Sequence, residues 1–258
     1  MKLEYNYHTH TYRCGHAYGT DEEYVLTAIK LGIKRLGFSD HIFLKEIDVR
    51  KGTVEEYIDS IRYLKEKYKD QIDIIIGFEA EYFECYKDYY KELLDTKKID
   101  YLIQGQHFDL INGEMVGYYN NPYKYLDDVI KGMNSGLYSY LAHPDIFIMW
   151  MPDIDRKVLE DVSIKIIKEA IKLDMPLELN LYGIIKKGWN NGEKYPSNLF
   201  FELCKKYNPK IVLGVDAHDP SHFNVDTINK AFEFAKKHKL NVITNYSIKN
   251  IIYKINKI

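Results

Sequence analysis

The chain has 258 residues, of which 46% are hydrophobic, and its formal net charge is −2. This length and composition suit one α/β barrel, and the near-neutral charge gives no bulk field that would favour nucleic acid or an acidic membrane surface. The three cysteines are far apart and form no C-x-x-C pair, the start lacks an apolar signal segment, and no run reaches the ~18–20 apolar residues of a membrane helix, so we expect a cytoplasmic protein.

Short apolar runs and amphipathic segments alternate along the chain, which predicts strands and helices in turn. Thr20 with Glu23 has the form of a capping box, and Thr53 and Asp155 are expected to cap two further helices. The expected strands are 3–7, 35–39, 72–78, 101–104, 138–142, 176–181, 211–215 and 241–244. The expected helices are 20–31, 53–68, 86–95, 122–133, 155–173, 196–207 and 225–237, followed by a helical tail.

About seven β–α units of this kind predict a parallel sheet with right-handed crossovers. We find no Pro/Gly/Ser linker, repeat or low-complexity tract, so residues 1–258 are expected to form one domain. Polar residues with metal-binding side chains follow nearly every strand. That distribution favours a closed β/α barrel over an open sheet, whose ligands would gather at one switch point.

Two pairs of such residues follow the first and the last barrel strands. His8 and His10 are two residues apart, so at strand period both side chains point the same way, into the barrel mouth. Asp216 and His218 repeat this spacing after the strand at 211–215. Nitrogen and oxygen donors that converge in this way predict a site for divalent transition metals.

A carboxylate and an imidazole follow the strands between them. Glu79 ends the most hydrophobic strand, where an unpartnered carboxylate is rare, but Glu81 points the same way and competes for the same role. His41 ends the second strand and is a further expected ligand. Asp40 points to the opposite face, so we expect it to support a ligand rather than bind metal itself.

Three more histidines complete the expected ligand set. His107 and His143 follow the fourth and fifth strands, and Pro144 restrains His143 to extended geometry. His16 lies in the loop just above the first strand. Cys14 in the same loop is a weaker candidate, because the other donors are nitrogen and oxygen.

The order of these motifs resembles the histidinol-phosphatase branch of the PHP (polymerase and histidinol phosphatase) family, over nearly the whole chain. The resemblance is carried by His-Thr-His at 8–10, Ser-Asp-His at 39–41, Ala-His-Pro at 142–144, Tyr-Pro-Ser at 195–197 and Gly-Val-Asp-Ala-His-Asp-Pro at 214–220. It implies a single-domain α/β fold, a distorted (β/α)7 TIM-like barrel, with a site for two or three divalent metals (Zn, Mn or Fe).

The resemblance also implies how the ligands divide among the metals. His8, His10, Glu79 and Asp216 would hold the first metal. His16, His41 and His218 would hold the second. Glu79 would bridge to the third, with His107 and His143.

The loop expected to bind phosphate differs from that of the histidinol-phosphatase branch, which carries an Arg in a Gly-x-Arg-Lys-Gly sequence. Here residues 183–188 read Gly-Ile-Ile-Lys-Lys-Gly, so Lys186 or Lys187 is expected to bind phosphate as a point charge without the bidentate fork of arginine. Arg156 is a further candidate phosphate ligand, and His222 a candidate substrate contact.

The resulting hypothesis is an enzyme that hydrolyses a phosphate monoester, L-histidinol phosphate above others, with a metal-activated, metal-bridged hydroxide as nucleophile. No G-x-S-x-G elbow or G-x-x-x-x-G-K-[ST] loop occurs, so no side-chain nucleophile is assigned. The expected partner is a small phosphomonoester, without nucleic acid or membrane. The alternatives are a PHP-type enzyme acting on another small metabolite, a nucleotide or phosphotyrosine, and a non-catalytic metal-binding module.

Overall fold

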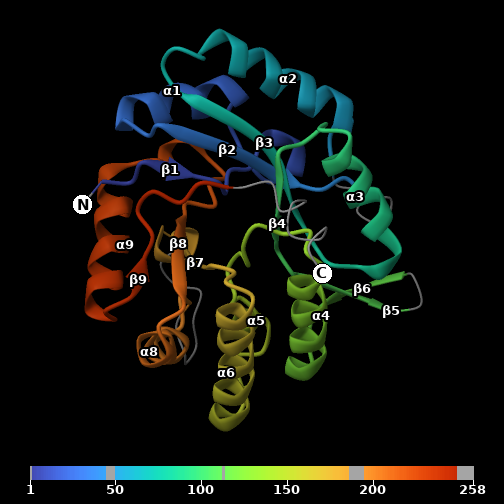
Figure 1. Cartoon of the computed structure of the whole chain (residues 1–258), viewed down its shortest axis with the longest axis vertical. Helices are drawn as coiled ribbons and strands as arrows, with labels where there is room; N and C mark the ends of the chain where they lie inside the picture. The colour runs from blue at the N-terminus through green and yellow to red at the C-terminus, as the bar shows by residue number, and fades with distance from the viewer. Residues whose placement is uncertain (1, 45–49, 112–113, 186–194, 249–258) are drawn as a thin grey trace.

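The computed structural model describes residues 2–44, 50–111, 114–185 and 195–248. The parallel strands occupy the interior, and helices lie around them on the outside (Figure 1). The strands are β1 (Tyr5–Asn6), β2 (Arg35–His41), β3 (Asp73–Ala80), β4 (Tyr101–Gln104), β5 (Phe108–Ile111), β6 (Glu114–Tyr118), β7 (Leu177–Asn180), β8 (Lys210–Gly214) and β9 (Asn241–Val242). The α-helices are α1 (Asp21–Leu31), α2 (Val54–Lys67), α3 (Lys87–Asp95), α4 (Pro122–Asn134), α5 (Phe147–Trp150), α6 (Arg156–Lys172), α7 (Tyr182–Ile185), α8 (Asn198–Tyr207) and α9 (Val225–Lys237). Short 3-10 turns lie at η1 (Tyr12–Cys14), η2 (Glu84–Tyr86) and η3 (Pro220–His222).

The predicted helix starts are confirmed by their capping hydrogen bonds. The Thr20 side chain accepts from the backbone N–H of Glu23, whose carboxylate accepts in return from the N–H of Thr20. Thr53 and Glu56 form the same reciprocal pair at the start of α2. The carboxylate of Asp155 caps α6. These contacts satisfy backbone donors that a helix leaves without partners in its first turn.

The parallel strands close into a barrel, as the sequence predicts. One sheet has the order β1-β2-β3-β4 and another the order β7-β8-β9. Parallel bridges from Gln104 to Leu141 and from Leu141 to Leu177 join β4 to β7. A bridge from Thr9 to Ala217 joins the end of β8 to the segment after β1. Because β8 pairs with β9 at its start and with this segment at its end, the ring is distorted rather than regular.

The expected strand at 138–142 is regular only at Leu141. Its backbone still bonds on both sides, since Leu141 N–H donates to Pro176 O at 3.1 Å and Ala142 N–H donates to Gln104 O at 2.9 Å. The extended geometry expected for His143 before Pro144 is wrong: His143 has a φ of +28°, which turns the chain out of the strand direction. This segment therefore completes the ring without forming a full strand.

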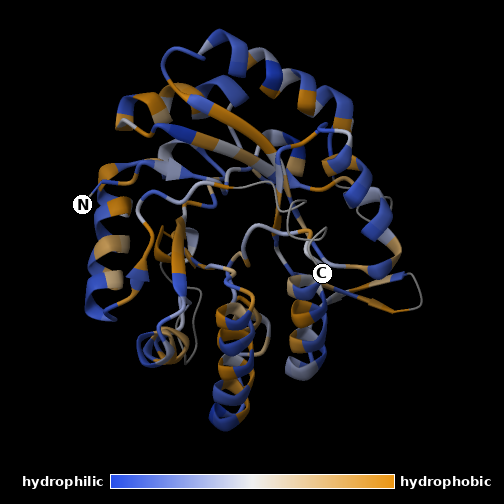
Figure 2. Ribbon diagram, in the orientation of Figure 1, coloured by the Kyte–Doolittle hydropathy of each residue, from blue (hydrophilic) through white to orange (hydrophobic). Residues whose placement is uncertain are grey.

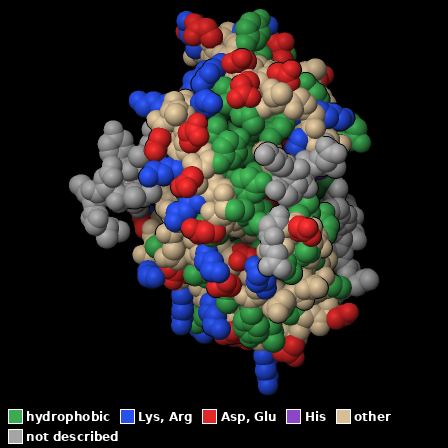
Figure 3. Space-filling model, turned by 90° about the vertical axis from the view of Figure 1, so that its right-hand side faces the viewer, with side chains coloured by type: hydrophobic (Ala, Val, Ile, Leu, Met, Phe, Trp, Pro, Cys, Tyr) green, Lys and Arg blue, Asp and Glu red, His purple; other side chains and the backbone are tan. Residues whose placement is uncertain are grey.

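The antiparallel hairpin of β5 and β6 is absent from the sequence prediction, which assigns no element to 105–121. Both strands are short, and their pairing shifts in register between Asp109 and Leu110. The hairpin contributes the exposed side chains of Ile111, Val116 and Tyr118. It lies on the face seen in Figure 3, where hydrophobic side chains gather between charged groups.

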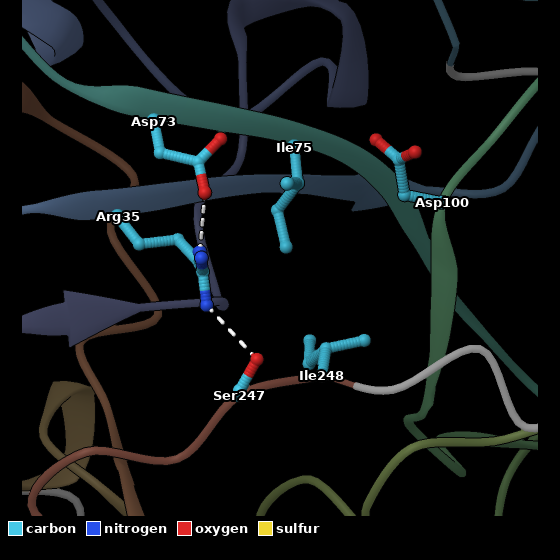
Figure 4. Close-up of a pocket in the computed structure, with 6 residues that line it drawn as sticks. All are labelled: Arg35, Asp73, Ile75, Asp100, Ser247 and Ile248. Atoms are coloured by element: carbon cyan, nitrogen blue, oxygen red, sulfur yellow. Dashed lines mark hydrogen bonds and ion pairs between the residues drawn. The ribbon is translucent and has the colours of Figure 1, made fainter.

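The opposite end of the barrel, where the strands begin, is covered by the chain after β9. Tyr246 O accepts a hydrogen bond from the Tyr7 hydroxyl at 2.6 Å, and Ser247 Oγ accepts from Arg35 at 3.0 Å. Arg35 also pairs with Asp73 in the small pocket that these residues line (Figure 4). Residues 245–248 are not helical, and the remainder of the expected helical tail lies outside the described residues.

Hydrophobic residues concentrate on the strands and on the helix faces turned toward them, while hydrophilic residues cover the outer faces (Figure 2). This is the pattern that burial of apolar surface produces in a layered α/β protein. Within the described part of the chain, no helix combines the length and the apolar character needed to cross a membrane.

Candidate metal centre

The nine predicted ligands converge at the end of the barrel where the parallel strands terminate. They come from segments that are far apart in the sequence, so the closure of the ring brings them together. His41 and Glu79 lie at the ends of β2 and β3, and the others lie in segments that follow a strand: His8, His10, His16, His107, His143, Asp216 and His218.

Glu79 lies at the centre of the cluster. Its Oε2 atom is 3.0 Å from His41 Nδ1 and 3.4 Å from Nε2 of both His8 and His10. Its other oxygen, Oε1, is 2.6 Å from His143 Nε2. One buried carboxylate thus contacts imidazoles from both sides of the site, which is the arrangement expected of a bridging ligand.

Glu79 and Glu81, the two alternatives for one ligand position, contact opposite nitrogens of His107. Glu79 Oε1 is 3.5 Å from His107 Nε2, whereas Glu81 Oε1 is 3.0 Å from the other nitrogen of that ring, Nδ1. A Cβ at Gly105 would collide with the Glu79 carboxylate, so a glycine is needed there for Glu79 to reach the centre. Glu81 orients His107 from behind instead.

Asp216 faces Glu79 across the two histidines that follow β1. Its Oδ1 atom is 3.0 Å from His10 Nε2 and 3.4 Å from His8 Nε2. His218 continues the cluster outward, with its Nε2 atom 3.0 Å from Nε2 of His16. The predicted members of the first and second ligand groups therefore lie side by side.

Several possible ligand atoms in this cluster are buried and have no hydrogen-bond partner among the residues that the structure describes. These atoms are His8 Nε2, His10 Nδ1 and Nε2, His41 Nδ1, Glu79 Oε2, His143 Nδ1 and Asp216 Oδ1. Leaving so many polar atoms unsatisfied would be costly, so a buried group of this kind requires a partner. Sets such as His8–Glu79–His143 and His8–His10–Asp216 have donors close enough together to hold one ion. Imidazole and carboxylate donors suit zinc, manganese and iron alike, so the cluster fits a divalent-metal centre.

The electrostatics of the cluster favour cation binding. Burial alone raises the pKa of Glu79 and Asp216, but the surrounding imidazoles outweigh it and hold the pKa of each carboxyl well below its usual value. Burial lowers the pKa of His41 and His218, and neighbouring positive charge acts in the same direction. Burial also acts to lower the pKa of His8, but the nearby carboxylates raise it above its usual value. Ionised carboxylates and neutral imidazoles are the forms that bind metal, and protons compete with the metal for the same atoms.

The buried carboxylate of Glu178 supports this cluster from β7, and the sequence interpretation missed it. Glu178 Oε1 lies 2.9 Å from His8 Nδ1, and Oε2 accepts hydrogen bonds at 3.0 Å from the backbone N–H of His143 and from the side chain of Asn180. The same amide group of Asn180 lies 3.0 Å from Asp216 Oδ2. A signal was present in the sequence: Glu178 and Asn180 alternate with leucines in a buried strand, which places both polar side chains on the same, inner face.

Asp40 lies beside His10 at the edge of the cluster. Its Oδ1 atom is 3.5 Å from His10 Nδ1, and its Oδ2 atom accepts a hydrogen bond from the Thr11 hydroxyl. Burial raises the pKa of the Cys14 thiol to about 12. The donor atoms of Cys14 and Asp40 are nevertheless close enough to that of His10 to hold one ion together, and Cys14 forms a second such group with His16 and His218.

The candidate substrate-binding residues do not lie together in the way that the candidate metal ligands do. Arg156 is the first residue of α6 and is exposed, and its side chain forms no ion pair with any residue that the structure describes. Lys186 and Lys187 lie outside the described residues. His222 does lie at the site, where its Nδ1 atom accepts a hydrogen bond from the backbone N–H of His218 at 3.2 Å.

An aromatic stack that sequence reasoning did not identify stands beside the metal cluster. Tyr118 stacks on Trp150 with ring centroids 4.9 Å apart and on Phe108 at 5.0 Å. Trp150 in turn meets the ring of His107 edge-on at 6.1 Å. The hairpin and α5 together place a flat apolar surface next to the donors around Glu79.

A β/α barrel whose strand ends gather buried imidazoles and carboxylates defines the class of metal-dependent barrel hydrolases. Within that class, the chain belongs to the PHP domain family, whose model matches residues 6–182.

Comparisons with known proteins agree with this family. A probable histidinol-phosphatase of Schizosaccharomyces pombe is 25% identical over 249 residues, which cover 83% of this chain and 80% of the relative. A probable histidinol-phosphatase of Deinococcus radiodurans is 25% identical over 233 residues, covering 83% and 85%. The fold is similar to a histidinol phosphate phosphatase from Lactococcus lactis solved with zinc, L-histidinol and phosphate, with a TM-score of 0.73, 19% identity, and coverage of 97% of this chain and 98% of that one.

Proposed function

We propose that this protein hydrolyses a phosphate monoester and that its substrate is L-histidinol phosphate. The observation that carries the proposal is the cluster of buried, unsatisfied imidazole and carboxylate atoms centred on Glu79. The probable histidinol-phosphatases of two organisms match over four-fifths of this chain or more, which supports the choice of substrate. The products would be L-histidinol and inorganic phosphate.

The ligands divide into three groups, and the first and third share Glu79. We assign His8, His10, Glu79 and Asp216 to a first ion, and His16, His41 and His218 to a second. Glu79, His107 and His143 form the third group. When bound, divalent ions activate water near neutral pH and neutralise the charge of a phosphate group. Zinc is the metal that we propose first, with manganese and iron as alternatives of the same donor chemistry.

The chain's own residues keep the donors in the required form. With Glu178 accepting from Nδ1 of His8, the proton of that ring stays on Nδ1 and the lone pair of Nε2 faces Glu79 and Asp216. Glu81 acts on His107 in the same way. Fixed tautomers of this kind position the donors before any ligand arrives.

The aromatic stack next to His107 supplies the surface for the leaving group. The rings of Phe108, Tyr118 and Trp150 are flat and apolar, and a planar ring on the alcohol side of the substrate can pack against them. An imidazole-bearing alcohol such as L-histidinol has such a ring. Trp150→Ala is therefore expected to raise KM for histidinol phosphate more than for a phosphate ester of a small aliphatic alcohol.

A panel of phosphate esters tests the proposal. Protein purified without oxygen would be loaded with zinc, manganese or iron and assayed for released phosphate with histidinol phosphate, sugar phosphates, nucleotides and phosphotyrosine. The expected result is the highest kcat/KM with histidinol phosphate. A clear preference for another ester would show that the proposed substrate is wrong, while the proposed phosphomonoesterase activity would stand. No turnover with any ester and any metal would contradict both the substrate and the activity.

A further inference from the structure

Arg50 lies beside the metal centre, in the loop between β2 and α2. Its Nη1 atom donates a hydrogen bond to Cys14 O at 3.0 Å, and this same oxygen is 3.2 Å from His16 Nδ1. The next residue is fixed as well, since Lys51 N–H donates to Arg13 O at 2.8 Å. The guanidinium is thus separated from one proposed metal ligand by a single shared carbonyl oxygen.

Arg50 differs from the other four arginines in that its charge is partly buried and has no counterion among the residues that the structure describes. Arg13, Arg35 and Arg62 each pair with an aspartate, and Arg156 is exposed to water. Arg50 is half-buried, and its Nε–H is buried without a hydrogen-bond partner within the described part of the chain.

A guanidinium that is partly removed from water is costly unless an anion accompanies it. The Cys14 carbonyl oxygen that Arg50 and His16 share places the guanidinium next to one of the three imidazoles assigned to the second ion. An anionic ligand at that ion would therefore lie near the guanidinium of Arg50.

We propose that Arg50 binds the phosphate group of the substrate and of the product, and so takes the part of the arginine that the 183–188 loop lacks. This inference rests on the proposed function, since it concerns the same site. Guanidinium suits the task because its planar fork can donate to two phosphate oxygens at once. While Nη1 donates to Cys14 O, the buried Nε–H has no partner among the described residues and is free to donate to such an oxygen. Arg50 is a substrate-binding residue in this proposal and transfers no proton.

Binding of inorganic phosphate to the metal-loaded protein tests this role without any turnover. Titration calorimetry would compare the parent with Arg50→Met and Arg50→Lys, after elemental analysis has shown equal metal content and circular dichroism an unchanged fold. Loss of charge-assisted hydrogen bonds should raise the Kd of phosphate roughly 10- to 100-fold in Arg50→Met. Arg50→Lys retains the charge but not the planar fork, so its Kd for phosphate should lie between those of the parent and Arg50→Met.

Matched variants separate this role from simple tethering of the loop. Arg62→Met removes an arginine whose pair with Asp59 is long and exposed, and it should leave phosphate affinity unchanged. Arg156→Met tests the rival candidate. If Arg50→Met binds phosphate like the parent, or only Arg156→Met weakens it, the proposal is wrong even though the parent hydrolyses esters. If Arg50→Met does not fold or does not bind metal, Arg50→Lys provides the test. A phosphate Kd equal to that of the parent in Arg50→Lys would contradict the proposal that the guanidinium fork recognises phosphate.

The same set of proteins distinguishes failure of this inference from failure of the proposed function. If the parent binds phosphate through Arg50 but hydrolyses no phosphate ester, the binding site is supported and the proposed hydrolase activity is wrong. If the parent hydrolyses histidinol phosphate, and KM and phosphate affinity are unchanged in Arg50→Met, the hydrolase activity is supported and the role of Arg50 is wrong.

Discussion

Glu178 Oε1 lies 2.9 Å from Nδ1 of His8, and both side chains are completely buried. The contact joins β7 to the segment after β1 and fixes which nitrogen of His8 faces the metal centre. The other oxygen of Glu178 holds the backbone of His143, and Asn180 links the same carboxylate to Asp216. A single carboxylate therefore connects three proposed metal ligands without reaching the centre itself.

We predict that Glu178→Ala lowers metal affinity about 10- to 100-fold, which is the usual effect of removing a group that orients a ligand. Glu178→Gln should have a smaller effect, because the amide oxygen can still accept from His8. The measurement is competitive titration of the metal-free protein with zinc and a chromophoric chelator. Glu233→Gln, on the exposed face of α9, is the matched control and should bind zinc like the parent. Parent-like affinity in Glu178→Ala would show that the network only packs the barrel.

The metal ligands could be predicted from sequence because strand ends follow directly from the alternation of apolar runs and helices. When the parallel strands close into a barrel, residues at their ends such as His8, Glu79 and Asp216 come together. This does not depend on the exact bounds of each strand. The choice of Glu79 over Glu81 could not be made from spacing, because both point to one face and only the approach past Gly105 separates them.

Other residues around the site depend on tertiary structure that local patterns do not encode. Arg50 is in a loop, where the sequence gives no period from which to infer the direction of a side chain. Trp150 contacts His107 and also stacks on Tyr118 of the unpredicted hairpin, so its place at the site depends on tertiary packing. The alternation of Glu178 and Asn180 with leucines indicates the face on which they lie, but it does not indicate which ligands they contact.

Asp216→Asn and His10→Ala are expected to abolish hydrolysis while the fold remains. Asp216 has a φ of +51°, a left-handed conformation that asparagine tolerates well, so the backbone should not change. Both side chains lie at the strand ends and not in the packed layers of the barrel. Phosphate release and circular dichroism would be measured together, with the exposed Asp127→Asn as control. Loss of the folded spectrum would assign these residues to structure, and activity within about tenfold of the parent would contradict their role as ligands.

Removal of the metals should destabilise the protein as well as inactivate it. We expect roughly two to three equivalents of metal per chain, since the ligands form three groups around Glu79. An ion present at about 100 times its Kd adds roughly 3 kcal/mol to the free energy of unfolding, and each kcal/mol corresponds to about 2–4 °C in Tm for a domain of this size. Elemental analysis and thermal melts before and after chelation check both points. Less than one equivalent, with no binding on reconstitution and no change in Tm, would show that the buried donors hold no metal.

The steric relationship between Gly105 and Glu79 provides a test of the geometry itself. A Cβ at position 105 would fall on the Glu79 carboxylate, so Gly105→Ala must displace that side chain or the strand beside it. Overpacking of this kind costs about 1–3 kcal/mol. The cost should be much smaller in a Glu79→Ala background, where the colliding atoms are gone, and a double-mutant cycle in metal-free protein isolates this coupling. Denaturant unfolding would supply the four free energies, and zinc titration should show that Gly105→Ala alone already weakens metal binding. If alanine at 105 costs the same with and without the Glu79 side chain, the two residues are not in contact, and Glu79 does not occupy the centre of the site.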